Sequence, residues 1–280
     1  MTSPHVTVLG AGVMGTAIAA LAVGHGLSVT LTDVDESKLD AARTEVPKQL
    51  RLAQLMGALT PVPGGELDTT RDLADVADTD VVIEAVIEIA EVKAKVLGEI
   101  SAVVRREALI VSNTSAIPID ELAASVEHPE RVVGIHFMNP PYLIRTVELI
   151  RGPRSSEAAL GTAKDLLALL GREPVVVGDG PGFVINRILQ RMINEAARIV
   201  DEGVATPEAV DAVFTGCLGH RSGPLTTGDL IGLDNVADSL RVLHERTGDA
   251  GYEPSALLLR KVAAGELGRK SGRGFYEYGS

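Results

Sequence analysis

The sequence predicts an α/β fold, a doubly wound parallel sheet, followed by an all-helical C-terminal domain. The first observation behind this prediction is an apolar run, residues 5–9, that meets Gly10, Gly12 and Gly15 in G-x-G-x-x-G spacing. The second is that apolar runs alternate with helical segments up to about residue 180, which is typical of a parallel sheet. The third is that strand-like runs disappear beyond that point.

Each element of the predicted sheet has its own signal. Residues 5–9 form the first expected strand, the Ala-rich segment after Gly15 a helix, and residues 27–32 a second strand. Residues 36–59 repeat apolar side chains every three to four positions and are expected to be helical up to the Pro61–Gly65 stretch. Apolar runs typical of buried parallel strands, or strand-like runs beside them, follow at 81–86, 108–115, 132–137 and 146–152. Helices are expected between them at 90–104 and 119–125.

The glycine spacing carries a specific chemistry. Gly10 permits a tight turn, Gly12 lets the backbone approach a pyrophosphate, and Gly15 lets the helix pack close to the strand. The N–H groups at the helix start, including Val13 and Met14, face the phosphates. We therefore predict a Rossmann-type dinucleotide site.

An acidic residue follows the second strand and bears on the choice of cofactor. Asp33 lies where a carboxylate accepts hydrogen bonds from a ribose diol. A 2′-phosphate would be repelled there, so NAD is the expected cofactor.

The composition changes near the GDGPGFVINRI stretch, where we place a domain boundary. Residues 1–180 are expected to be the NAD-binding domain, and residues 181–280 a helical domain for substrate binding and dimerisation. Helices are expected at 184–202, 207–215, 225–247 and 254–264. The first of these has a wide apolar stripe, which predicts a helix that is central or shared in a homodimer.

Composition and charge exclude several classes of protein. The chain has 280 residues and a formal net charge of −12, which argues against nucleic acid as a partner. No run approaches ~20 apolar residues and no signal peptide is recognisable, so we expect no membrane association and a cytoplasmic location. The single cysteine, Cys217, excludes an internal disulfide, and we expect no metal site. We expect Cys217 to pack as a small apolar residue.

Hydride transfer from an alcohol requires a base that takes the hydroxyl proton. His136 lies at the carboxyl end of an expected strand, where open α/β sheets bind their ligands. Glu148 follows on a return strand that can bring its carboxylate back to the imidazole. From spacing alone, a general-base pair and an unrelated histidine and glutamate both stay open. Ser115 and Asn186 can orient a carbonyl or hydroxyl, although such residues more often cap helices.

Six blocks of sequence together resemble the L-3-hydroxyacyl-CoA dehydrogenase family, particularly its short bacterial 3-hydroxybutyryl-CoA dehydrogenases. The blocks are VLGAGVMGTAIA, SNTSAIPI, GIHFMNPPYLIRTVELIRG, GPGFVINRIL, GPLTTGDLIGLDN and LGRKSGRGFYEY. They run in this order and cover essentially the whole chain, so they are far more specific than any one motif.

The resemblance implies an NAD-dependent enzyme that oxidises the 3-hydroxyl of an acyl thioester to a carbonyl. The residues that match the family's catalytic groups are His136, its partner Glu148, Ser115 and Asn186. The residues that match its cofactor contacts are Asp33, Glu88, Lys93, Asn139 and Lys270. Because His136 and Asn186 fall in different predicted domains, the site is expected in the cleft between them.

Two departures from the family pattern concern the substrate. Gln49 and Met56 stand where the family has its CoA-contacting Ser and Lys, so that Lys48 and Arg51 are the basic residues left nearby. The MNPPYLIRTVE loop also looks like that of dehydrogenases acting on glyceryl groups of acyl carrier proteins in polyketide extender-unit biosynthesis. The carrier of the acyl group therefore stays open between CoA and an acyl carrier protein.

Two further functions remain as alternatives. A gulonate-type hydroxy-acid dehydrogenase is one, because related proteins acting on gulonate also carry an NPPY loop. A dehydrogenase-derived structural protein, as in some lens crystallins, is the other. The intact set of His136, Glu148, Ser115 and Asn186 argues against a purely structural role.

Overall fold

The computed structural model describes residues 3–59 and 64–279. The chain divides into two compact units, residues 1–180 and residues 181–280. Within the described ranges, no helix is both long and apolar enough to cross a membrane. Each unit has its own hydrophobic core, so each is treated separately below.

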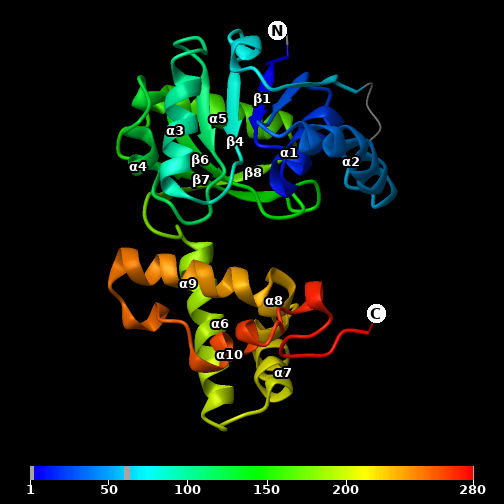
Figure 1. The fold of residues 1–280 in the computed structure, drawn as a ribbon, viewed down its shortest axis with the longest axis vertical. Helices are drawn as coiled ribbons and strands as arrows, with labels where there is room; N and C mark the ends of the chain where they lie inside the picture. Colours follow the sequence, from blue (N-terminus) through cyan, green and yellow to red (C-terminus); the bar gives the residue numbers. More distant parts are fainter. Residues whose placement is uncertain (1–2, 60–63, 280) are drawn as a thin grey trace. The chain divides into compact units, whose positions relative to one another are not determined.

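The first unit is built on one eight-stranded sheet in the order β3-β2-β1-β4-β5-β6-β7-β8 (Figure 1). The strands are β1 (Val6–Leu9), β2 (Val29–Thr32), β3 (Leu67–Thr70), β4 (Val81–Glu84), β5 (Leu109–Ser112), β6 (Val132–His136), β7 (Thr146–Arg151) and β8 (Glu173–Gly178). Strands β1 to β6 pair in parallel, which confirms the predicted fold class.

At one edge the sheet contains an antiparallel pair, formed by the return strand expected to carry Glu148. β7 pairs antiparallel with β6, and β8 pairs parallel with β7. The reason is the short connection between β6 and β7, residues 137–145, since a parallel crossover needs about a dozen residues or more. The antiparallel return places Glu148 directly opposite His136 in the strand register.

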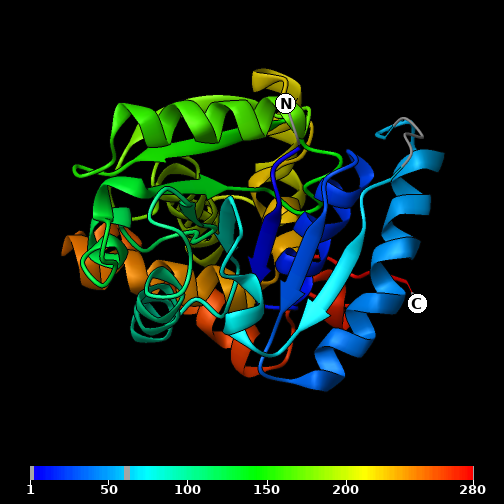
Figure 2. The same cartoon turned by 90° about the horizontal axis from the view of Figure 1, so that it is seen from above.

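Helices cover both faces of the sheet (Figure 2). They are α1 (Val13–Gly24), α2 (Glu36–Leu55), α3 (Ala90–Ser101), α4 (Ile119–Ala123) and α5 (Glu157–Leu169). The main core joins α1, α2 and α5 to one face, and a smaller cluster joins α3 to the other. α2 ends at Leu55, four residues before the expected end, and residues 61–63 of the expected helix-ending stretch lie outside the described ranges.

The second unit is all-helical, as predicted. Its helices are α6 (Ile185–Asp201), α7 (Pro207–Leu218), α8 (Pro224–Ile231), α9 (Leu233–Thr247) and α10 (Ala256–Ala263). The expected single helix over 225–247 is two helices, because Gly232 adopts a positive φ of 99° that a right-handed helix cannot include. Cys217 is exposed on α7, so the expectation that it packs inside was wrong.

Two buried carboxylates hold the C-terminal segment against the helices of this unit. Asp211 accepts a hydrogen bond from the Tyr276 hydroxyl, at 2.9 Å, and caps the start of α8 through the Leu225 N–H. Asp229 accepts from the Tyr278 hydroxyl and from the N–H of Phe275, both at 2.9 Å. Burial, together with the bond to Asp229, raises the pKa of Tyr278 to about 12, so this hydroxyl stays a donor.

Candidate active site

The predicted site residues of the first unit gather at one edge of the sheet. The carboxyl ends of the parallel strands β1, β2, β4, β5 and β6 lie side by side there in the strand order. The glycine loop follows β1, Asp33 follows β2, Glu88 follows β4, and Ser115 follows β5. His136 ends β6. This edge is where open α/β sheets bind ligands.

The geometry of the glycine loop fits a dinucleotide. Gly10 has a φ of 99°, and a Cβ there would lie 2.8 Å from the Ala85 carbonyl oxygen. A Cβ on Gly15 would lie 1.8 Å from the Gly10 carbonyl oxygen, so no larger residue fits. A Cβ on Gly12 would meet nothing within 4 Å, which leaves open space beside the backbone for a ligand.

The N-terminus of α1 is open to an anion. Gly12 is the N-cap and supplies no side-chain cap, and the first turn carries no acidic residue. The first intrahelical bond runs from the Thr16 N–H to the Gly12 carbonyl, at 2.9 Å. The N–H groups of Val13, Met14 and Gly15 precede that bond and remain without an intrahelical acceptor, as pyrophosphate binding requires.

Asp33 is held in place by the loop that it faces. Its Oδ2 accepts from the Ala11 N–H at 2.8 Å, and its Oδ1 accepts from the Asp35 N–H at 3.0 Å. Each carboxylate oxygen has a second lone pair, so the group can still accept from a ribose diol. Lys38 lies 3.9 Å from Oδ2. The residues present therefore fit NAD.

Two exposed apolar side chains flank this region, and the sequence patterns did not single them out. Val34 follows β2 and is 85% exposed, and Ile87 follows β4 and is 58% exposed. β2 and β4 lie on either side of β1. The pair therefore stands on both sides of the glycine loop, where a flat base can contact apolar surface. Their signal in the sequence is only their position just past a strand end.

A buried ion pair lies beneath the edge. Lys93 and Glu84 are both fully buried, and the Lys93 ammonium donates to Glu84 Oε1 at 2.7 Å. Lys93 also donates to the Val86 carbonyl at 3.2 Å and lies 3.2 Å from Glu88 Oε2. Ser112 donates to the other Glu84 oxygen at 2.6 Å. Groups of this chain thus hold the Lys93 ammonium through two hydrogen bonds and a further ion pair.

The SNTS segment connects three strand ends. Glu88 Oε1 accepts from the Thr114 hydroxyl at 2.6 Å and from the Ser115 N–H at 2.7 Å. Asn113 accepts from the Phe137 N–H at 3.0 Å, next to His136. This motif therefore fixes the loop after β5 against the loops after β4 and β6. The position of Ser115 depends on that network.

The central feature of the site is a buried histidine–carboxylate pair. His136 Nδ1 lies 2.7 Å from Glu148 Oε2, and both side chains are about 5% exposed. A carboxylate only accepts, so we assign the proton to Nδ1, which leaves Nε2 as the basic nitrogen. The spacing argument had left this contact open, and the structure provides it.

The remaining predicted residues belong to other segments of the chain. Asn139 is exposed on the β6–β7 loop. Asn186 lies in the first turn of α6, in the second unit. Lys270, also in the second unit, pairs with Asp234 at 2.6 Å. Within the described part of the chain, no cluster of three or more His, Cys, Asp or Glu side chains is suited to a metal ion.

The fold and this edge define a class of protein: an oxidoreductase that binds a dinucleotide on a Rossmann-type sheet. Comparison with known families agrees. Residues 5–180 match the NAD binding domain of 3-hydroxyacyl-CoA dehydrogenase, and residues 182–278 match its C-terminal domain.

The chain therefore belongs to the 3-hydroxyacyl-CoA dehydrogenase family and is an NAD-dependent oxidoreductase acting on CH–OH. The 3-hydroxybutyryl-CoA dehydrogenase of Bradyrhizobium diazoefficiens is 42% identical over 277 residues, covering 98% of this chain and 94% of the relative. That of Mycobacterium tuberculosis is 40% identical over 280 residues, covering 98% of both. The crystal structure of (S)-3-hydroxybutyryl-CoA dehydrogenase PaaH1 from Ralstonia eutropha is 36% identical, with a TM-score of 0.90 and complete coverage of both chains.

The names of these relatives bear on the substrate classes that the sequence left open. Each of them is named for a CoA thioester. The alternative subgroup of polyketide extender-unit enzymes has no support in the comparisons. The NPPY loop suggested both this subgroup and a gulonate-type enzyme. The loop therefore does not distinguish between these two activities.

Proposed function

We propose that this enzyme oxidises 3-hydroxybutyryl-CoA or a similar short 3-hydroxyacyl-CoA, with His136 as the general base. The observation that carries the proposal is the buried contact between His136 and Glu148, at the sheet edge that also holds the glycine loop. NAD, when bound, supplies the hydride acceptor. His136 Nε2 takes the proton of the 3-hydroxyl as the C–H bond breaks, and Glu148 stabilises the imidazolium that forms.

Ser115 and Asn186 are proposed to hold the reacting oxygen by hydrogen bonds. Their task is orientation, since a misplacement of ~1 Å can reduce a rate ~100-fold. The Ser115 N–H donates to Glu88 Oε1 at 2.7 Å, and this bond fixes the backbone at Ser115. It supports the proposed role, because a side chain that orients a substrate must be held on a rigid backbone.

Binding of NAD is proposed to use three features of the first unit. The N–H groups at the start of α1 bind the pyrophosphate, Asp33 binds the adenosine ribose, and Val34 and Ile87 contact the adenine. Asn139, Glu88 and, from the second unit, Lys270 remain proposed contacts. Lys93 is proposed to act by holding Glu88, at 3.2 Å, since the Lys93 side chain is itself buried and bonded to Glu84 and Val86.

The nucleotide part of CoA is proposed to lie on α2. A pocket of about 250 Å³ there is lined by apolar side chains together with Lys48 and Arg51. The partner of Lys48 is Glu45, at 3.4 Å, and both side chains are well exposed, so this pair is weak and leaves the ammonium available to a phosphate. Met56 does not prevent this, because it is itself exposed at the end of the helix.

A homodimer formed by the second unit is also proposed. Large apolar side chains are exposed on its helices, including Ile188 at 63%, Val213 at 56% and Leu230 at 64%. Large apolar side chains that are exposed to this extent support an interface between copies of the chain.

The test is NADH formation with 3-hydroxybutyryl-CoA, compared with gulonate. We expect turnover of the thioester at a rate that His136→Gln reduces by ~100-fold or more, while NADH binding is retained. Near-normal turnover by His136→Gln would overturn the assignment of the base. Faster turnover of gulonate would overturn the substrate class.

A further inference from the structure

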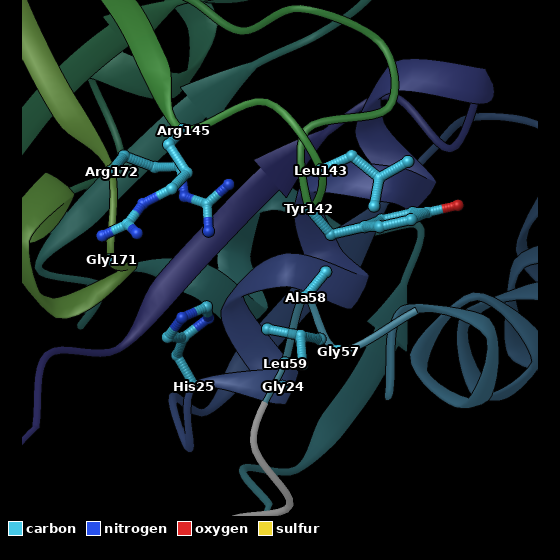
Figure 3. Close-up of a pocket in the computed structure, with 10 residues that line it drawn as sticks. All are labelled: Gly24, His25, Gly57, Ala58, Leu59, Tyr142, Leu143, Arg145, Gly171 and Arg172. Carbon is cyan, nitrogen blue, oxygen red and sulfur yellow. The ribbon is translucent and has the colours of Figure 1, made fainter. Parts of the chain in front are cut away.

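A second pocket lies in the first unit, and the β6–β7 loop forms part of its lining (Figure 3). Its volume is about 380 Å³, within the ~300–1,000 Å³ typical of small-ligand sites. The end of α1, the turn after α2, the β6–β7 loop and the turn between α5 and β8 contribute to it. None of its residues belongs to the proposed NAD or catalytic groups.

A buried guanidinium forms one wall. Arg172 is 6% exposed; its Nε donates to the Leu170 carbonyl at 3.0 Å, and its Nη1 donates to the carbonyls of Pro141 and Ile144, at 2.7 and 3.1 Å. Nη2 makes no hydrogen bond to any described residue. The carbonyls fix the guanidinium in place but do not neutralise it, and a buried charge is unfavourable without a counter-charge.

A second guanidinium stands beside the first. In Figure 3 the side chains of Arg145 and Arg172 gather with the His25 imidazole at one end of the pocket. Arg145 has Glu173 at 3.4 Å, but these side chains are 69% and 65% exposed, so the pair is weak. Burial and the neighbouring Arg145 lower the pKa of Arg172, and Glu173 only partly opposes this.

His25 adds no negative charge to balance the two arginines. Its Nδ1 donates to the Leu21 carbonyl at 2.8 Å, which is an acceptor only. Burial and the charge of Arg172 lower the pKa of His25, so the imidazole is neutral near pH 7. Two arginines, one exposed carboxylate and a neutral histidine leave this end of the pocket positive.

The other end of the pocket is apolar. Figure 3 shows Leu59, Leu143 and the ring of Tyr142 away from the guanidinium groups. We propose that this pocket binds an organic phosphate monoester, with the phosphate on Arg145 and Arg172 and the organic group against Leu59 and Tyr142. Paired guanidiniums match phosphate oxygens in geometry and charge. Arg172 also holds the loop between His136 and Glu148, so occupancy stabilises that loop.

The first test uses phenyl phosphate, which has a flat apolar body and no nucleotide. Isothermal titration of the full chain at low salt, with saturating NADH to fill the dinucleotide site, is expected to show binding tighter than that of inorganic phosphate. Arg145→Gln is expected to weaken it by ~10-fold or more. Arg151→Gln is the matched control, because Arg151 lies at the other end of β7 and pairs with an exposed glutamate, Glu157.

A second measurement separates two sources of the phosphate. If it is the 3′-phosphate of CoA, Arg145→Gln raises KM for 3-hydroxybutyryl-CoA and leaves KM for the dephospho-CoA thioester unchanged. If it is a separate metabolite, both KM values stay unchanged and phenyl phosphate does not compete with the thioester. Absence of phenyl phosphate binding to the wild type, or equal losses in Arg145→Gln and Arg151→Gln, would overturn the proposal. The titration does not depend on the enzyme's substrate.

Discussion

Replacing Glu148 by Gln tests the proposed proton transfer most directly. The side chain keeps its size and an oxygen acceptor at 2.7 Å from His136 Nδ1, but loses its charge. Taking roughly 4 Å between the charge centres and an effective dielectric constant of about 20, the attraction between imidazolium and carboxylate is about 4 kcal/mol. Gln retains part of the hydrogen bond, so we expect the barrier to rise by about 2 to 4 kcal/mol, roughly 30- to 1,000-fold in kcat.

The assay is steady-state NADH formation, with NADH binding measured separately by fluorescence. NADH affinity is expected to stay within ~2-fold, because Glu148 is not among the proposed cofactor contacts. The double variant His136→Gln/Glu148→Gln is expected to be no slower than His136→Gln alone, since Glu148 acts through the imidazole. Glu157→Gln, an exposed carboxylate after the same strand, is the control. A kcat for Glu148→Gln within ~3-fold of wild type would refute the reasoning.

The cofactor site, the buried ion pair and the proposed dimer each give a further prediction. Asp33→Ala is expected to lower kcat/KM for NAD by about 10- to 100-fold, the usual worth of a hydrogen bond to a charged group. It is also expected to improve use of NADP, since Lys38 then remains to attract the 2′-phosphate; an unchanged preference would count against the role of Asp33. Lys93→Met is expected to lower the free energy of unfolding in urea by about 3–5 kcal/mol, because Glu84 is left as an unpaired buried charge. The additional change Glu84→Gln is expected to recover part of that loss, and a Lys93→Met protein as stable as wild type would contradict it. Light scattering at micromolar concentration is expected to report a dimer that Ile188→Glu dissociates, and a monomeric wild type would end that proposal.

The sequence predicted those parts of the molecule whose signal is local. The dinucleotide site could be predicted from the glycine spacing and Asp33. At Gly10 and Gly15 the backbone leaves no room for a side chain, so only glycine fits there. The contact of His136 with Glu148 could be anticipated, although not decided, from the sequence. A short loop forces the next strand to return antiparallel beside the first. In each case a few neighbouring residues decide the geometry.

Other elements were missed because their signal lies elsewhere in the chain. β3 reads LDTT and β8 is largely exposed, so neither of these edge segments shows the apolar run of a buried strand. The burial of Lys93 depends on Glu84, on a neighbouring strand, and cannot be inferred from its own helix. The basic pocket joins residues 25, 145 and 172, which are brought together only by the fold.

The anchoring of the C-terminal segment limits where the chain can be truncated or fused to another protein. Phe275, Tyr276 and Tyr278 each donate a hydrogen bond to Asp211 or Asp229, both of which are buried. A chain truncated before residue 275 would expose two carboxylates and part of the hydrophobic core of the second unit to water. We expect such a chain to aggregate during expression. A purification tag or fusion partner at the C-terminal end therefore needs a flexible spacer beyond Tyr278.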